Sequence, residues 1–213
     1  MSLYWQAADG TGAVERLTES PNSQRSTAIS PDGRRLIFTE DTGKTGQDVM
    51  QVELDGARRA SPVVQSRFGE RGGIISSDGR WLAYEANDSG RFEVYVRPFP
   101  DVNSGHWQVS TAGGAQPLWA RNGQELFYVA PGGAVMRVGV ERNPSWVATT
   151  PTPVVKEGYV TRNPRGRMHD ISSDGQRFLM IKNGSGSDQA GEAPKAIVVQ
   201  HWTEGLKRLV PTK

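Results

Sequence analysis

The sequence predicts an all-β fold of repeated, four-stranded antiparallel units, and three observations predict it. A four-residue turn motif occurs at residues 30–33, 76–79, 120–123 and 172–175, and each copy ends in glycine. The steps between successive glycines are 46, 44 and 52 residues, a spacing that suits a propeller blade and exceeds that of helical solenoid repeats. Similar apolar strands flank every copy. The pattern is typical of a β-propeller, here with four blade cores.

The turn motif has the chemistry of a hairpin connection. An acidic or amide residue precedes the glycine in every copy, and the pairs are Asp32, Gly33, Asp78, Gly79, Asn122, Gly123, Asp174 and Gly175. Asp and Asn tolerate turn conformations and bond nearby backbone amides, while glycine takes the left-handed conformation that rejoins the strands. We therefore assign these residues a structural role rather than a catalytic one.

The strand after each turn is apolar on both faces. One face carries Leu36, Phe38, Leu82, Tyr84, Leu126, Tyr128, Phe178 and Met180. The opposite face carries Ile37, Ala83, Phe127 and Leu179. Because side chains alternate along a strand, such a strand is covered on both sides, as it is when neighbouring blades stack on it. The strand before each turn ends in an apolar residue, which is Ile29, Ile75, Trp119 or Ile171.

Two further strands complete each predicted blade. The third strand is rich in Val, Ile, Tyr and Met and lies at residues 48–54, 92–97, 134–140 and 196–202. Weaker fourth segments occur at residues 57–64, 107–111 and 152–156, and two of them contain proline. Proline is tolerated at a sheet edge, so these segments are predicted to be the outermost strands.

The two ends of the chain do not complete a whole number of blades. We divide a single domain, residues 1–213, into an orphan hairpin at 3–17 and blades at about 25–64, 71–111, 116–156 and 167–202. An unpaired strand edge invites association. The hairpin therefore closes against the last blade in a ring of about five units, pairs with another copy of the chain as a homo-oligomer, or is completed by a partner. The sequence leaves open whether the chain is a fragment of a longer protein.

Composition argues against several functional classes. The chain has 25 basic and 23 acidic residues, a formal net charge of +2, and nucleic-acid binding would need clustered phosphate contacts rather than a slight excess. It has no cysteine, which excludes disulfides, zinc–thiolate sites and a thiol nucleophile. No stretch approaches the roughly 18 consecutive apolar residues of a membrane helix. We expect neither nucleic acid nor a membrane segment.

The sequence contains no pattern that indicates a metal, a cofactor or a catalytic centre. The histidines lie in different predicted blades, without metal-ligand spacing, and they are His106, His169 and His201. No Gly-x-Ser-x-Gly motif of a hydrolase nucleophile occurs. We therefore expect no metal, no cofactor and no enzymatic activity.

Basic residues gather in the approaches to the innermost strands. They are Arg25, Arg71, Arg162, Arg165 and Arg167, together with His169. In a propeller these approaches converge near the central channel, so several guanidinium groups are predicted to face a common mouth. Such a mouth suits a carboxylate-bearing or phosphate-bearing partner. The alternative is that Glu19, Glu70 and Glu157 in the same loops neutralise the arginines as surface pairs.

The repeats resemble the bacterial TolB-like, or WD40-like, family of propeller repeats. Residues 3–6, 77–84, 94–100 and 173–179 carry the likeness, which spans almost the whole chain. The chain looks especially like the propeller modules at the C-terminal end of some bacterial serine/threonine protein kinases. No Trp-Asp dipeptide ends a strand, so the eukaryotic WD-repeat class is the poorer match.

The resemblance implies a non-enzymatic scaffold for protein or peptide binding or sensing, as part of a larger bacterial protein such as a kinase. It also implies an extracytoplasmic, periplasmic location, which the residues themselves do not decide. The alternative is the substrate-gating propeller of a prolyl oligopeptidase-like peptidase. An enzyme acting within the channel would need several inward-facing carboxylates. In the innermost strands the sequence indicates only Asp170.

Overall fold

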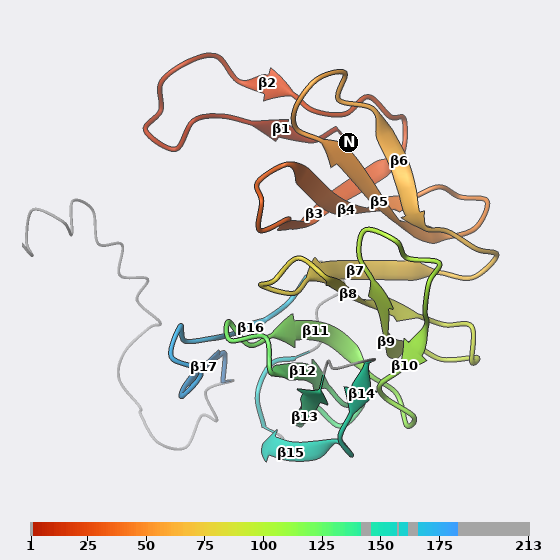
Figure 1. The fold of residues 1–213 in the computed structure, drawn as a ribbon, viewed down its shortest axis with the longest axis vertical. Coiled ribbons are helices and arrows are strands. Elements are labelled where there is room, and N and C mark those ends of the chain that lie inside the picture. Colours follow the sequence, from red (N-terminus) through yellow and green to blue (C-terminus); the bar gives the residue numbers. More distant parts are fainter. Residues whose placement is uncertain (1, 142–145, 157, 162–165, 183–213) are drawn as a thin grey trace, which may run out of the picture. The chain divides into compact units, whose positions relative to one another are not determined.

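The computed structural model describes residues 2–141, 146–156, 158–161 and 166–182. These residues form β-strands and turns without a helix, and all of them lie in one compact unit, Met1–Lys182. Consecutive antiparallel sheets follow one another along the chain (Figure 1). The all-β class predicted from the sequence is confirmed.

Two complete four-stranded blades form the first part of the repeat. Blade 1 has the order β3-β4-β5-β6, with β3 (Ser23–Ile29), β4 (Arg35–Asp41), β5 (Gln47–Glu53) and β6 (Ala60–Val64). Blade 2 has the order β7-β8-β9-β10, with β7 (Glu70–Ile75), β8 (Trp81–Ala86), β9 (Glu93–Pro98) and β10 (Trp107–Gln108). In both blades, consecutive strands pair as antiparallel neighbours, which is the arrangement of a propeller blade.

The remaining strands form a third blade, an inner pair and a hairpin. Blade 3 contains β11 (Ala115–Trp119), β12 (Glu125–Val129) and β13 (Val135–Glu141), and β13 pairs with both β14 (Val147–Ala148) and β15 (Thr152–Val155). Blade 4 is described as the pair β16 (His169–Ile171) and β17 (Phe178–Met180). The orphan hairpin consists of β1 (Tyr4–Trp5) and β2 (Glu15–Arg16). The predicted strand at 196–202, and His201 within it, lie outside the described residues.

The predicted turn chemistry is observed at all four positions. The glycines Gly33, Gly79, Gly123 and Gly175 have φ angles of 71°, 73°, 67° and 71°, which are left-handed conformations that favour glycine. Each glycine amide donates to the carbonyl oxygen three residues earlier. The acidic or amide side chain of each turn accepts the backbone amide two residues later.

The strands after the turns pack between neighbouring units, as predicted. Phe38 is fully buried on the hairpin side of blade 1, in a cluster with Leu17. Ile37, on the opposite face of β4, packs toward Leu82 of blade 2. The same alternation places Ala83 with Leu126 and Tyr128 of blade 3, and Phe127 with Ile171 and Phe178 of blade 4. Radial stacking of sheets therefore holds the described blades together.

Two apolar positions depart from the repeated pattern. Ile29 is 59% exposed, because the unit before blade 1 is the small hairpin β1–β2, which covers Leu36 but does not reach Ile29. Leu179 is 75% exposed. The expectation that the strand after each turn is covered on both faces is therefore wrong at Leu179.

The outer strands are shorter than predicted. Pro62 and Pro153 lie in the edge strands β6 and β15, which confirms the reason given for them. β10 ends at Gln108 because the hydroxyl of Ser110, rather than a backbone carbonyl, accepts the amide of Val94 at 2.8 Å. The short strand β14 had no sequence signal.

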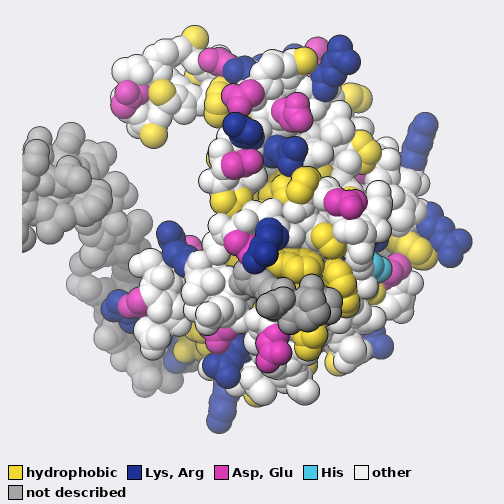
Figure 2. Space-filling view, viewed as in Figure 1, with side chains coloured by type: hydrophobic (Ala, Val, Ile, Leu, Met, Phe, Trp, Pro, Cys, Tyr) yellow, Lys and Arg dark blue, Asp and Glu magenta, His cyan; other side chains and the backbone are white. Residues whose placement is uncertain are grey.

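The face shown in Figure 2 is mixed in charge. On the face shown in Figure 2, basic and acidic side chains are interspersed among uncharged ones, in agreement with the formal net charge of +2. Among the described residues, no helix has the length and apolar character needed to cross a membrane.

Candidate functional site

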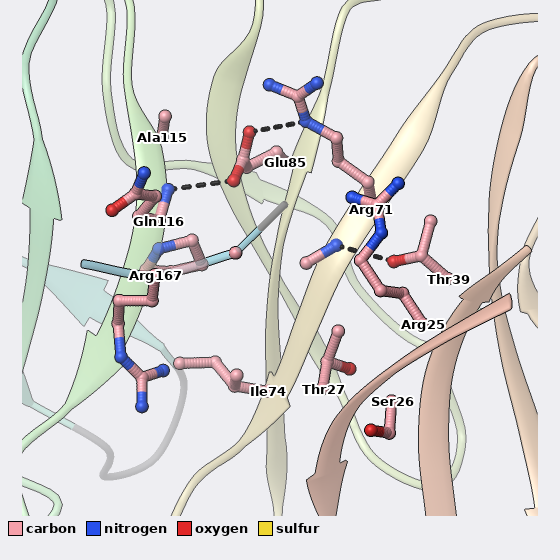
Figure 3. A pocket seen from close by; sticks show the side chains of 13 residues that line it. Arg25, Ser26, Thr27, Thr39, Arg71, Ile74, Glu85, Ala115, Gln116 and Arg167 are labelled. Atoms are coloured by element: carbon pink, nitrogen blue, oxygen red, sulfur yellow. Dashed lines mark hydrogen bonds and ion pairs between the residues drawn. The ribbon is translucent and has the colours of Figure 1, made fainter. Parts of the chain in front are cut away.

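A cavity of about 310 Å³ lies where the innermost strands of three blades meet. Its walls come from β3, β4, β7, β8 and β11, and from Gly166 and Arg167 before β16 (Figure 3). β7 packs against both β3 and β11. We call this space the axial cavity.

Each of these three innermost strands has a bulge beside the axial cavity. The register shifts between Ser26 and Ala28 in β3, between Arg71 and Ile74 in β7, and between Ala115 and Leu118 in β11. A bulge bends its strand and redirects side chains. The equivalent bulge residues Gly72 and Gln116 have φ angles of 66° and 54°, so the same left-handed step recurs in two blades.

Polar side chains from the preceding blade hold the bulges in place. The Gly72 amide donates to Thr39 Oγ1 at 3.1 Å, and the Gln116 amide donates to Glu85 Oε1 at 2.8 Å. Thr39 and Glu85 occupy the same repeat position, six residues after the turn glycine. The Gln116 side chain makes a similar contact to the next blade, since its Oε1 accepts the amide of Met168 at 3.3 Å. The shape of the cavity therefore depends on contacts between blades.

Three arginines of the cavity share one repeat position. Arg25, Arg71 and Arg167 each lie eight residues before a turn glycine, and Ala115 takes this position in blade 3. All four residues line the axial cavity. Sequence reasoning selected the arginines one by one, and counting back from the turn glycine would have revealed the column. Arg162 and Arg165 lie outside the described residues.

Arg71 is held by three neighbours. Its Nε donates to Glu85 Oε2 at 2.9 Å, and its Nη1 lies 3.5 Å from Gln47 Oε1. The guanidinium carbon lies 3.7 Å from the centre of the Phe92 ring, in cation–π geometry. Glu85 is 4% exposed. Both of its oxygens are bonded, one to Arg71 and the other to the Gln116 amide.

The acidic residues differ from the sequence-based expectation. Glu19 pairs with Arg16 at 3.3 Å, and the buried Glu70 accepts from Ser66. Glu157 lies outside the described residues. The carboxylate beside Arg71 is Glu85, which sequence reasoning missed although it stands directly opposite Arg71 in the register of β7 and β8. The expectation of a single carboxylate in the innermost strands is also wrong, because Glu70 begins β7.

Arg167 and His169 lie together at the start of blade 4. Arg167 Nε donates to the carbonyl oxygen of His169 at 3.0 Å. His169 is 4% exposed, and neither ring nitrogen has a hydrogen-bond partner among the described residues. Burial, followed by the nearby charge of Arg167, lowers the pKa of the imidazole from 6.5 to about 4, against the opposing effect of Asp170. His169 is therefore neutral at pH 7, and it supports the wall rather than lining the cavity.

The described residues contain no group of three or more side chains that could hold a metal ion. The axial cavity is instead a positively charged space, with three arginines and one glutamate. Its chemistry suits the binding of an anionic group, because guanidinium groups donate planar, charge-assisted hydrogen bonds.

The fold and the sheet order define the chain as a β-propeller protein. The part that the structure describes runs from the hairpin β1–β2 to the inner strands of blade 4. Its fold is that of TolB-like propellers. TolB from Acinetobacter baumannii has a similar structure, with a TM-score of 0.60 and 14% identity over 87% of this chain and 44% of that chain. A protein from Agrobacterium tumefaciens that is assigned as TolB is also similar, with a TM-score of 0.51 and 15% identity over 70% of this chain and 59% of that chain.

A third similar structure is an oligogalacturonate lyase in complex with manganese, with a TM-score of 0.54 and 11% identity over 83% of this chain and 52% of that chain. No protein-family model and no curated protein matches the sequence. The chain spans 44% and 59% of the lengths of the two TolB structures. At these identities the likeness establishes the fold, and the resemblance to kinase-attached modules stays a prediction.

Proposed function

We propose that the chain is a non-enzymatic binding module of a larger bacterial protein, such as a serine/threonine kinase. In this proposal the axial cavity binds an acidic segment of a protein or peptide partner. The arginine column carries the proposal: three blades place a guanidinium group at the same repeat position around one cavity. The three arginines and Glu85 give the lining a formal charge of +2.

The state of Glu85 supports binding rather than catalysis. A general acid or base needs an oxygen that can exchange a proton with the substrate. Glu85 is nearly inaccessible, and its two oxygens accept from Arg71 and from the Gln116 amide. This carboxylate therefore serves to fix Arg71 and the bulge of β11.

The proposal is tested by titrating the purified protein with a ten-residue Asp/Glu-rich peptide and with its Asn/Gln counterpart, using calorimetry. We expect the acidic peptide alone to bind, more weakly as salt is raised. Arg167→Ala should weaken binding by about tenfold or more, the usual effect of losing a hydrogen bond to a charged group. Arg121→Ala is the matched control, because it removes the same charge from an exposed turn outside the cavity.

Equal affinity for the two peptides would contradict the proposal, as would acidic-peptide binding that Arg167→Ala and Arg25→Ala leave unchanged. The attachment to a kinase is tested separately, by reading the coding sequence on either side of these 213 residues.

A further inference from the structure

We propose that the axial cavity recognises a carboxylate carried on a short aliphatic unit, and that Arg167 binds it. This inference rests on the proposed function and names the chemistry of the ligand. An Asp or Glu side chain and the C-terminal residue of a peptide both supply this group.

Arg71 has a mainly structural role. Its Nε is paired with Glu85, and its guanidinium group rests on the ring of Phe92. Removing it would leave Glu85 buried without its charged partner, which is costly. A ligand anion at Arg71 would also lie beside the negative charge of Glu85.

Arg167 is in a different situation. Its Nε is engaged by the carbonyl oxygen of His169, and no described carboxylate forms an ion pair with it. The walls displace water from part of the side chain and so lower the pKa of its guanidinium group, against the opposing effect of Asp170. A partly desolvated cation gains from an incoming anion, and the two Nη groups at its tip match the two oxygens of a carboxylate.

The cavity wall includes three apolar residues among its polar ones. Ile74, Ala115 and Pro117 line the same cavity. Figure 3 shows the Arg167 side chain extending toward the Ile74 side, away from Arg71 and Glu85. A ligand held by Arg167 therefore presents an anion and a few apolar atoms within a short distance. A carboxylate on a short aliphatic unit does so, whereas a phosphate would turn polar oxygens toward Ile74.

The size of the cavity agrees with this ligand. About 310 Å³ lies at the lower end of the range for ligand pockets, which is enough for one side chain or one terminal residue.

Four peptides of one parent sequence, all N-acetylated, test the inference by calorimetry. The first has one internal Glu and an amidated C-terminus, and the second has no acidic residue and a free C-terminal Val. The third replaces the Glu with phosphoserine, and the fourth replaces it with Gln, both amidated. We expect the first or the second to bind about tenfold or more tightly than the third, and the fourth not to bind. The tighter of the first two identifies the source of the carboxylate.

Variants of the protein assign the contact. Arg167→Gln should abolish the preference for the carboxylate peptide, and Arg167→Lys should restore it only in part, because Lys lacks the planar fork. Ile74→Val should weaken binding of the carboxylate peptide by about fourfold, the effect of losing one buried methylene group. Arg121→Gln is the charge-matched control. Thermal unfolding measures whether each variant is folded. If Arg167→Gln does not fold, the comparison is made with Arg167→Lys alone.

Two results would overturn the inference while leaving the proposed function standing. The first is a phosphoserine peptide that binds as tightly as the better carboxylate peptide. The second is binding of the long acidic peptide without binding of either single-carboxylate peptide. Failure of the long acidic peptide to bind would instead remove the proposed function, and the inference with it.

Discussion

The two ends of the innermost hairpins differ in how far their contacts reach along the chain. At the turn end, which is the end with the Asp-Gly or Asn-Gly turn, Ser76 Oγ donates to Asp78 Oδ1 at 2.5 Å and accepts the amide of Trp81 at 3.1 Å. These hydrogen bonds lie within six consecutive residues. At the cavity end, the bulge amides of Gly72 and Gln116 are satisfied by side chains 33 and 31 residues away. The turn end has the same structure in every blade because its hydrogen bonds are local, whereas the structure of the cavity end depends on packing between blades.

This difference separates what holds each blade together from what shapes the candidate site. The turn end can form before neighbouring blades meet, because its hydrogen bonds are local. The cavity end exists only when blades have stacked, since Thr39 and Glu85 cap the bulges of the next blade. Changes at the cavity end should therefore cost more stability than comparable changes at the turn end.

The largest expected effect is the pH dependence from His169 at the cavity end. Its pKa is about 4 in the folded protein and 6.5 as the ordinary value. Above pH 6.5 both states are neutral and stability is at its full value. Between pH 6.5 and 4 only the unfolded state binds the proton, so the free energy of unfolding should fall by about 3 kcal/mol over this window.

Urea unfolding at pH 7 and pH 4 measures this loss, and His169→Leu is the control. The imidazole has no hydrogen-bond partner among the described residues, so an apolar side chain of similar size can replace it. The wild-type protein should lose about 3 kcal/mol more than the variant between the two pH values. Equal losses in both proteins would refute the buried neutral histidine.

The second effect concerns Glu85. Glu85→Ala leaves Arg71 without its charged partner and the Gln116 amide without an acceptor, so we expect a loss of about 2–3 kcal/mol in the free energy of unfolding. Glu125→Ala is the matched control, since Glu125 pairs with the half-exposed Arg137 at 3.4 Å and should cost less than about 1 kcal/mol. Similar losses in the two variants would show that the contact between blades is no stronger than a surface pair.

The same substitution at both ends gives the third and most direct comparison. Gly73→Ala would place a Cβ atom 2.7 Å from Val49 Cγ1 of blade 1, so the Val49 side chain or the backbone at the interface must shift. We expect a loss of about 1.5 kcal/mol by urea unfolding, within the range for overpacked cores. An unchanged or increased stability would mean that the interface between blades 1 and 2 has room to adjust.

Gly79→Ala is the counterpart at the turn end. Here a Cβ atom would have nothing within 4 Å, and the cost comes only from the φ angle of 73°. We expect a loss of about 1 kcal/mol, measured in the same way. A loss larger than that of Gly73→Ala would reverse the comparison between the two ends.

The same contrast explains how much the sequence could predict. The turns, the buried faces of β4, β8 and β12, and the order of strands follow from local turn chemistry and alternation, so they were predicted within a few residues. The role of Glu85 could not be recognised, because it depends on a register between strands and on the bulge of the next blade. β14 had no signal, since two residues carry no measurable periodicity.

The candidate site shows the same division. The residues Arg25, Arg71 and Arg167 were selected from the sequence, and the structure places them around one cavity. The different roles of Arg71 and Arg167 were not predictable. Arg71 contacts the ring of Phe92, which lies elsewhere in the sequence, and Arg167 donates to the backbone carbonyl of His169 rather than to a side chain.

The smallest effect is a gain, and it concerns the third turn, which lacks part of the motif. Ala120 and Asn122 stand where the other copies have Ser and Asp. The backbone bonds are the same, with Gly123 donating to the Ala120 carbonyl at 2.8 Å, and Asn122 Oδ1 accepts the Gln124 amide at 2.9 Å. The hydroxyl bonds seen in the other turns are missing from this one because alanine has no hydroxyl group.

Ala120→Ser combined with Asn122→Asp should therefore raise the free energy of unfolding by about 0.5–1 kcal/mol, the net value of one typical hydrogen bond. The site is compatible with serine, because Ala120 is 1% exposed and the equivalent Ser76 is 0% exposed with its hydroxyl fully bonded. Ala120→Ser alone should gain less, since a neutral amide is a weaker acceptor than a carboxylate. If urea unfolding shows the double variant to be less stable than the wild type, the hydroxyl bonds of the other turns do not stabilise them, and the turn end owes its recurrence to the glycine alone.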